Sequence, residues 1–174
     1  MKIYRVFCAF LTIVAALNAA EKKKSASAGG GVVPFEKLIV LLPDLAGWKR
    51  QEPRGETVRG KPPMTRVTAD YDKGEGTLSF EMMDLVGSKE MLAQAREHTK
   101  PGFSEKRSDG YTKAITVRDF PGTEEWTPQA KNGFISVIVA DRFAVKVTGS
   151  YVPDVATIRA AVEAIDLAAL AALK

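Results

Sequence analysis

Residues 132–167, NGFISVIVADRFAVKVTGSYVPDVATIRAAVEAIDL, decide the fold. The pair Asn132-Gly133 predicts a turn, because both residues tolerate positive φ. The run from Phe134 to Ala140 is almost entirely apolar and rich in β-branched residues, which is typical of a strand covered on both faces. After the break at Asp141-Arg142, the stretch from Phe143 to Tyr151 alternates between apolar and polar residues, which predicts a neighbouring strand with one buried face.

A long C-terminal helix is expected to follow this hairpin. Pro153 interrupts the strand, and Asp154 suits a helix N-terminus, where an acidic side chain meets unpaired backbone N–H groups. The apolar residues that come next recur at steps of three and four, as on one face of a helix: Val155, Ile158, Val162, Ile165 and Ala169. A hairpin with a returning amphipathic helix forms a two-layer core.

The chain upstream adds strands and two shorter helices. Alternating patterns predict strands over residues 64–73, 77–85, 111–119 and 122–127, joined by short turns, and a strand edge followed by a long loop over residues 52–63. Helical spacing predicts a short helix over residues 34–42 and a middle helix from Ser88 to Thr99. The predicted fold is therefore α+β: a single, mostly antiparallel sheet of about six to seven strands with a short N-terminal, a middle and a long C-terminal helix.

The N-terminus has the pattern of a secretory signal peptide. Lys2 and Arg5 precede the apolar run 6–17, and cleavage is expected near Ala19 or Ala20. An uncleaved anchor is the alternative, because positive charges at residues 22–24 directly follow the apolar run. The expected organisation is a signal peptide over residues 1–20, a flexible polar tether over residues 21–33 and one α+β domain over residues 34–174. The expected location is periplasmic or secreted.

Cleavage would also change the composition. The single cysteine, Cys8, would be lost with the signal peptide, which excludes disulfides and thiolate chemistry in the mature domain. Of 25 basic and 21 acidic residues, Lys2 and Arg5 would leave as well, so 23 basic and 21 acidic residues remain, a net charge of +2. This small excess gives no reason to expect a nucleic-acid ligand.

Familiar catalytic and metal-binding patterns are missing from the sequence. His98 is the only histidine, and one histidine without cysteine argues against zinc, copper and haem. The acids around residues 70–75 lack the spacing of a calcium loop, and the glycine-rich stretches lack the ending of a phosphate-binding loop. Glu124 and Glu125 are adjacent on an expected strand, so they point to opposite faces and cannot act together on one bond. We expect no cofactor, no metal and no catalytic residue.

One segment carries an excess of positive charge, which makes it the candidate binding surface. Residues 49–66 hold six basic and two acidic residues, beside Trp48. Such a surface could bind an anionic ligand or face a membrane, although a solvated loop beside an edge strand explains the charges equally well. A second tryptophan could line the same cleft or pack beside the sheet. The candidate ligand or anion surface consists of Trp48, Arg50, Arg54, Arg59, Arg66 and Trp126.

The layout resembles a known fold group. The opening L-L-P-D-L-A-G-W at residues 41–48, the paired strands before the middle helix and the terminal hairpin with its helix are similar to small exported bacterial proteins of uncharacterised role. Their layout is similar to the Mog1/PsbP-like α/β sandwich. This resemblance implies an architecture and transfers no active site, because that fold group hosts unrelated roles.

Three function classes remain open. The leading expectation is an exported, non-catalytic binding or accessory domain whose partner is a small ligand or an envelope protein. The first alternative is an envelope-surface protein that uses the basic segments 22–24 and 49–66. The second is a hydrolase with an unrecognised serine or carboxylate site.

Overall fold

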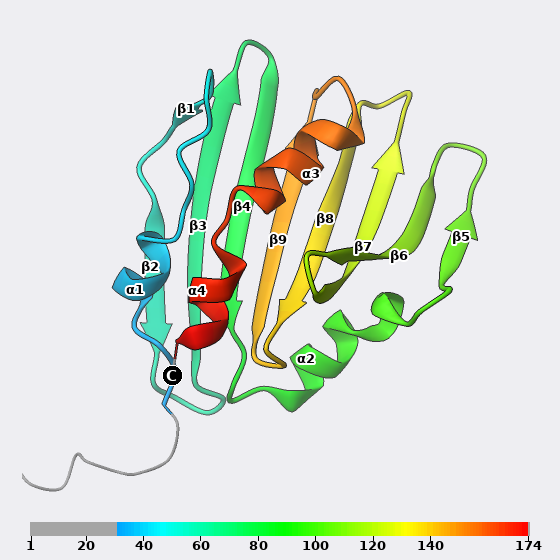
Figure 1. The fold of residues 1–174 in the computed structure, drawn as a ribbon. Helices are drawn as coiled ribbons and strands as arrows, with labels where there is room; N and C mark the ends of the chain where they lie inside the picture. The colour runs from blue at the N-terminus through cyan, green and yellow to red at the C-terminus, as the bar shows by residue number, and fades with distance from the viewer. Residues whose placement is uncertain (1–30, 174) are drawn as a thin grey trace, which may run out of the picture. The chain divides into compact units, whose positions relative to one another are not determined.

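A computed structural model describes residues 31–173, and the predicted signal peptide lies outside them. This part of the chain forms strands and short helices in the following order: α1 (Phe35–Ile39), β1 (Lys49–Arg50), β2 (Arg54–Val58), β3 (Met64–Lys73), β4 (Gly76–Asp84), α2 (Lys89–Ala95), the 3-10 helix η2 (Glu97–Thr99), β5 (Ser104–Lys106), β6 (Tyr111–Val117), β7 (Phe120–Thr127), β8 (Asn132–Val139), β9 (Phe143–Ser150), α3 (Val155–Glu163) and α4 (Leu167–Ala172). Figure 1 shows the strands joined in one sheet.

The predicted α+β class and antiparallel sheet are confirmed, but the strand count is wrong. The sheet has nine strands, in the order β1-β3-β4-β9-β8-β7-β6-β5, and β2 also pairs with β3. The pairings are antiparallel. The additional strands lie at the two edges: β1 has two residues and β5 has three, whereas β2 lies within residues 52–63, where a strand edge was predicted. Strands as short and polar as β1 and β5 carry no apolar alternation, so the sequence pattern could not predict them.

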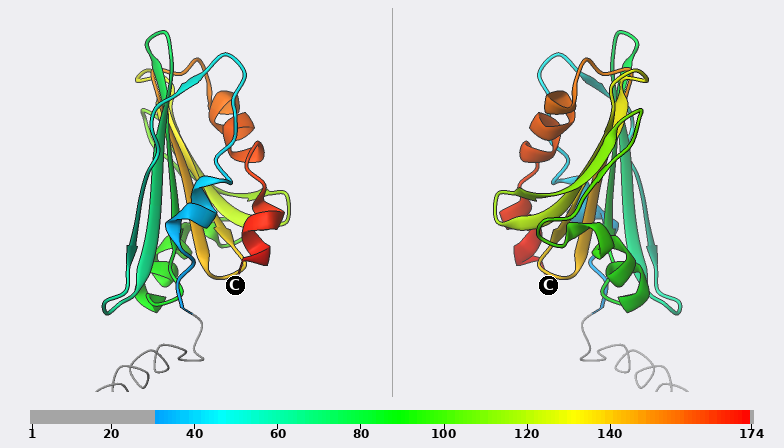
Figure 2. Two further views of the ribbon diagram at one scale, coloured as in Figure 1. Left: turned by 90° about the vertical axis from the view of Figure 1, so that its left-hand side faces the viewer. Right: turned by 90° about the vertical axis from the view of Figure 1, so that its right-hand side faces the viewer.

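The two faces of the sheet are covered differently. The helix face packs against α1, α3 and α4 and contains the main core, which includes Leu38, Phe80 and Val147. The opposite, outer face carries α2, which lies over the small cluster of Leu85, Ile138 and Ala144. Figure 2 shows α3 and α4 on one side of the sheet and α2 on the other. The strand at Phe134–Ala140 is therefore buried on both faces only near its end.

The predicted long C-terminal helix is two helices. Helix α3 ends at Glu163, and α4 begins after Asp166, whose carboxylate accepts a hydrogen bond from the Ala169 N–H at 2.8 Å. Asp166 thus acts as a second N-cap inside the expected helix. The break turns α4 so that Leu167 and Leu170 also reach the core.

The predicted turn at Asn132-Gly133 is also wrong. These residues open β8, where they pair with Thr127 and Trp126 of β7. The turn lies just before them, over residues 128–131, and Lys131 has the positive φ of 49°. The long pairing of β7 with β8 therefore overrides the local preference of Asn-Gly.

An ionic clamp fixes the start of the described chain. Asp84 is fully buried and accepts hydrogen bonds from the Val33 N–H at 2.7 Å and from two nitrogens of Arg142 at 2.7 and 3.0 Å. Arg142 also donates to the Gly31 carbonyl at 2.9 Å. Val33 is itself buried in the main core. The packed domain therefore includes residues 31–33, which the sequence assigned to the tether.

Close contact between α3 and β9 predicts the effect of one substitution. A Cβ atom at Gly149 would lie 2.7 Å from Ile158 and 2.8 Å from Val152, and both side chains are fully buried. Because neither can move into solvent, Gly149→Ala is expected to lower the free energy of unfolding by about 1–3 kcal/mol. Urea unfolding measures the loss. Gly60→Ala is the control, since its nearest neighbour is 3.7 Å away, and an equal effect at both glycines would contradict the prediction.

Candidate functional site

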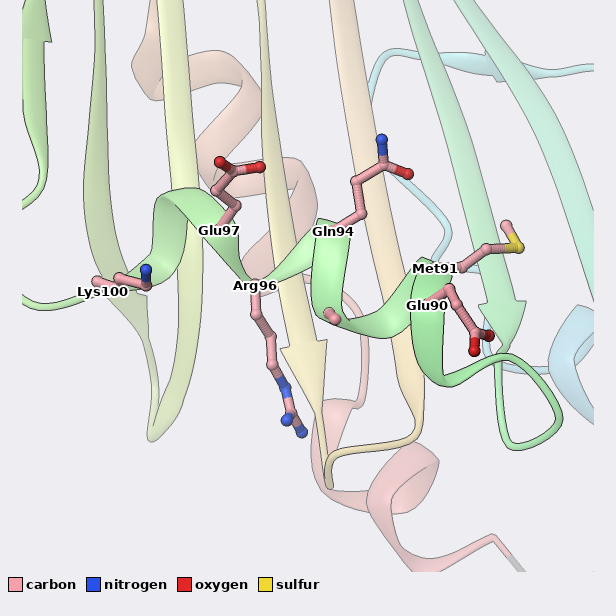
Figure 3. A pocket seen from close by; sticks show the side chains of 7 residues that line it. Glu90, Met91, Gln94, Arg96, Glu97 and Lys100 are labelled. Atoms are coloured by element: carbon pink, nitrogen blue, oxygen red, sulfur yellow. The ribbon is translucent and has the colours of Figure 1, made fainter.

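A depression of about 610 Å³ runs along α2 and η2. Its lining residues come from this one helical segment and the residue that follows it, with none from the sheet. Figure 3 shows Gln94 and Glu97 pointing one way and Arg96 the opposite way. Arg96 pairs with Asp141 at 2.5 Å. Because its polar groups do not converge, this depression is a poor binding site.

A second depression, about 460 Å³, contains two of the sequence-predicted residues. Arg54 and Arg66 line it on the outer face, together with Glu56 and Thr68. Arg66 is engaged with Glu81 at 2.6 Å, so its positive charge is already compensated. Both arginines are exposed, and Arg54 is the one that forms no ion pair among residues 31–173.

The structure does not bring the other predicted residues to that place. Arg50 donates to the Leu42 carbonyl at 3.2 Å and lies beside Asp44. Arg59 follows β2 in an exposed loop. The two tryptophans pack against the main core, with Trp126 only 7% exposed. The six residues are therefore divided among different parts of the domain, and a shared anion surface remains a prediction.

A third depression, about 490 Å³, lies where the β5–β6 hairpin meets the β7–β8 turn, and we call it the β5–β6 pocket. Its lining residues come from both hairpins: Ser104, Lys106, Arg107, Ser108, Asp109, Gly110, Tyr111, Lys113, Pro128 and Gln129. The register pairs Ser104 with Lys113 and Lys106 with Tyr111, so these four side chains share one face. Polar side chains from two neighbouring strands therefore converge on this pocket.

The helix face remains open at this end of the sheet. Helix α3 packs on β8 and β9, and no helix lies over β5 and β6 on that face in Figure 1. Trp126 is the cross-strand partner of Tyr111, so one residue of the predicted surface adjoins the pocket. The apolar helix face thus becomes polar where the helices no longer cover it.

A buried carboxylate borders the pocket. Glu124 on β7 is 1% exposed. It accepts hydrogen bonds from the Tyr111 hydroxyl at 2.9 Å and from Arg159 of α3, and the Lys113 ammonium lies 3.0 Å away. A buried charge needs partners, and those of Glu124 come from both α3 and β6. This ionic cluster therefore links α3 to the β6–β7 hairpin.

The cluster changes the acidity of its members. Burial alone would raise the pKa of the Glu124 carboxyl, but hydrogen bonds from Lys113 and Tyr111 and the nearby charges of Arg159 and Lys113 outweigh it, so this pKa is lowered. Burial, followed by the bond to Glu124 and its charge, raises the pKa of Tyr111 to about 12. At neutral pH the acid is therefore charged and the phenol is a neutral donor.

The cations near the pocket differ in exposure and in the partners that they already have. Arg107 donates to the Thr112 hydroxyl at 2.7 Å and lies 3.7 Å from Glu125. Thr112 and Glu125 belong to the outer face, so Arg107, although it lines the pocket, has its guanidinium engaged by outer-face partners. Lys106 is exposed, and the Lys113 side chain is 42% exposed. The two lysines are thus the cations that can meet a ligand.

Sequence reasoning missed this site for an identifiable reason. The prediction that Glu124 and Glu125 face opposite ways is confirmed, since Glu125 bonds Thr112 on the outer face. Glu124, however, lies on the same face as the buried Trp126. An acid at an inward position of a strand predicts a buried ion pair, and that feature could have identified the cluster.

Residues 31–173 show no group of three or more potential metal-ligating side chains. His98 is exposed in η2, where its ring stacks on Phe103 at a centroid distance of 4.8 Å. None of the helices over these residues is long and apolar enough to cross a membrane. No known protein family, curated protein or solved structure matches this chain.

Proposed function

We propose that the protein is an exported, non-catalytic binding domain whose ligand occupies the β5–β6 pocket. The observation that supports this most is the convergence of Ser104, Lys106, Tyr111 and Lys113 on one depression assembled from two hairpins. Binding sites generally combine a concave shape with a few convergent polar groups. Export is inferred from the basic and apolar pattern of residues 1–20.

The buried acids support a binding role over a catalytic one. Asp84 is occupied by Arg142 and by the N–H groups of Val33 and Val86. Glu124 is occupied by Tyr111, Lys113 and Arg159. A general acid or base needs a proton that can be exchanged with a substrate, whereas both carboxylates are enclosed by internal donors.

We retain the Mog1/PsbP-like sandwich as part of the same proposal. Its support is a central antiparallel sheet that carries α3 and α4 on one face and α2 on the other. The envelope-surface alternative rests on residues 22–24 and on the exposed Arg54 and Arg59 within segment 49–66. Because these two arginines stand apart from the β5–β6 pocket, the two proposals can be tested separately.

Blocking the pocket tests the proposed binding role. The purified protein is screened by thermal shift against phosphate, dicarboxylates, amino acids and sugars, since a ligand that binds the folded state raises the melting temperature. Ser104 is exposed on the pocket side of β5, so Ser104→Trp is expected to fill the pocket and abolish the shift. Thr116→Trp, exposed on the outer face of β6, is the matched control.

Two results would contradict the proposal. One is a screen in which no compound raises the melting temperature. The other is a ligand whose shift persists in Ser104→Trp or disappears equally in Thr116→Trp, because that ligand would bind elsewhere.

A further inference from the structure

We propose that the β5–β6 pocket takes a compact oxyanion, a carboxylate or a phosphate group, held between the ammonium groups of Lys106 and Lys113. This inference rests on the proposed binding role of the pocket and adds the chemical class of its ligand. It also assigns Lys113 a second partner besides Glu124.

Strand register places the two lysines within reach of one anion. Lys106 is directly opposite Tyr111, which makes Lys113 its diagonal neighbour on the same face. Diagonal neighbours in an antiparallel pair are about 7–8 Å apart, a separation that long side chains bridge. Both ammonium groups can therefore approach a single small anion above Tyr111. The hydroxyl of Ser104, opposite Lys113, is a further donor.

Lys113 can leave Glu124 without isolating that buried acid. Glu124 keeps the hydrogen bonds from Tyr111 and Arg159 when the Lys113 ammonium turns away. The Lys113 side chain is 42% exposed, and its ammonium lies 5.0 Å from the centroid of the ring of Tyr111, which also lines the pocket. A lysine side chain has several rotatable bonds, so this exchange needs no change in the backbone.

Of the nearby acids, Glu124 is the one that pairs with a pocket lysine, and Lys113 leaves it to meet the ligand. Glu124 is buried behind Lys113, and Glu125 bonds Thr112 on the outer face. Asp109 lines the pocket, but it is 3.6 Å from Arg107, which compensates its charge. The two lysines are thus the charged side chains left to a ligand entering from solvent.

The outer-face depression is a weaker candidate for the same ligand. Its Arg66 is paired with Glu81 at 2.6 Å, and Glu56 lines it alongside Arg54. An anion there would meet one uncompensated cation next to a carboxylate. The β5–β6 pocket offers Lys106, a second cation in Lys113 once it turns from Glu124, and the Ser104 hydroxyl on one face.

Calorimetric titration with inorganic phosphate and with succinate tests the inference. Lys106→Met and Lys113→Met are each expected to weaken binding at least about tenfold, the loss typical of a charge-assisted hydrogen bond. Lys37→Met on α1 is the control, because Lys37 is exposed on a different element. Glu124→Gln should bind the anion more tightly than the native protein, since it releases Lys113. Because Lys106 is exposed, Lys106→Met keeps the test valid even if a change at Lys113 impairs folding.

The outcomes separate the two proposals. Binding of phosphate alone assigns a phosphoryl ligand, and binding of succinate alone assigns a carboxylate. If Ser104→Trp abolishes the binding of some compound that neither lysine variant affects, the oxyanion inference is wrong and the pocket still binds a ligand. If Ser104→Trp affects no compound at all, both proposals are wrong.

Discussion

Asp84→Ala is expected to lower the free energy of unfolding by about 3–5 kcal/mol, the usual cost of removing one partner from a buried ion pair. Asp84 is fully buried, and two nitrogens of Arg142 donate hydrogen bonds to its carboxylate. The Arg142 side chain is only 17% exposed. The substitution leaves that guanidinium and the N–H groups of Val33 and Val86 without their acceptor. A domain of this size has a total stability of about 5–15 kcal/mol, so the loss would be a large fraction of it.

Chemical denaturation of the native protein, Asp84→Ala, Arg142→Leu and the double variant measures this effect. In the double variant both charges are gone, so the loss should be smaller than the sum of the two single losses. Asp70→Ala is the control, because Asp70 is exposed on β3 and its carboxylate accepts a hydrogen bond from the Ser79 hydroxyl alone among the described side chains. A loss below about 1 kcal/mol for Asp84→Ala would show that the clamp contributes little.

Glu124→Gln is expected to destabilise the protein by about 2–3 kcal/mol near neutral pH, because it removes the charge that Lys113 and Arg159 compensate. The value is below that for Asp84, since the Arg159 side chain is 35% exposed and both cations can regain water. The folded-state pKa of Glu124 lies below its ordinary value of 4.5. Its stabilisation is therefore complete above pH 4.5 and is lost as the pH falls through the lowered folded-state pKa.

The measurement is the stability difference between the native protein and Glu124→Gln as a function of pH. The difference should be constant from neutral pH to about 4.5 and shrink in more acidic solution. Glu125→Gln is the matched control, because this neighbour faces the outer side and is 35% exposed. A difference that grows towards acid pH would contradict the lowered pKa of Glu124.

The long central strands could be predicted from the sequence because the physics that forms them is local. Alternation over residues 64–73 corresponds to β3, where Val67, Ala69 and Tyr71 are buried as predicted. The hairpin of β8 and β9 and the start of α3 after Asp154 were also located, and Asp154 accepts a hydrogen bond from the Thr157 N–H. Side-chain periodicity and capping leave their signs within a few residues, so a single sequence contains them.

What the sequence could not predict depends on contacts between distant segments. Strand β5 exists because it pairs with β6, and its three charged or polar residues have no pattern of their own. The candidate site has the same origin, since Arg159 reaches Glu124 from 35 positions away. The excess of positive charge in the sequence lies in residues 49–66. The structure instead brings two lysines, at residues 106 and 113, together in one pocket.

The clamp at Asp84 also determines how the domain would respond to a mechanical load. A pull on the chain ahead of Val33 is transmitted through Asp84 and Arg142 to the ends of β4 and β9. These strands are adjacent in the middle of the sheet, with strands on both sides. Along the chain, however, Val33 leads to α1 and then to β1 and β2 at the edge of the sheet. The clamp should therefore bear the force first and protect these edge elements when the domain is drawn from its N-terminal side.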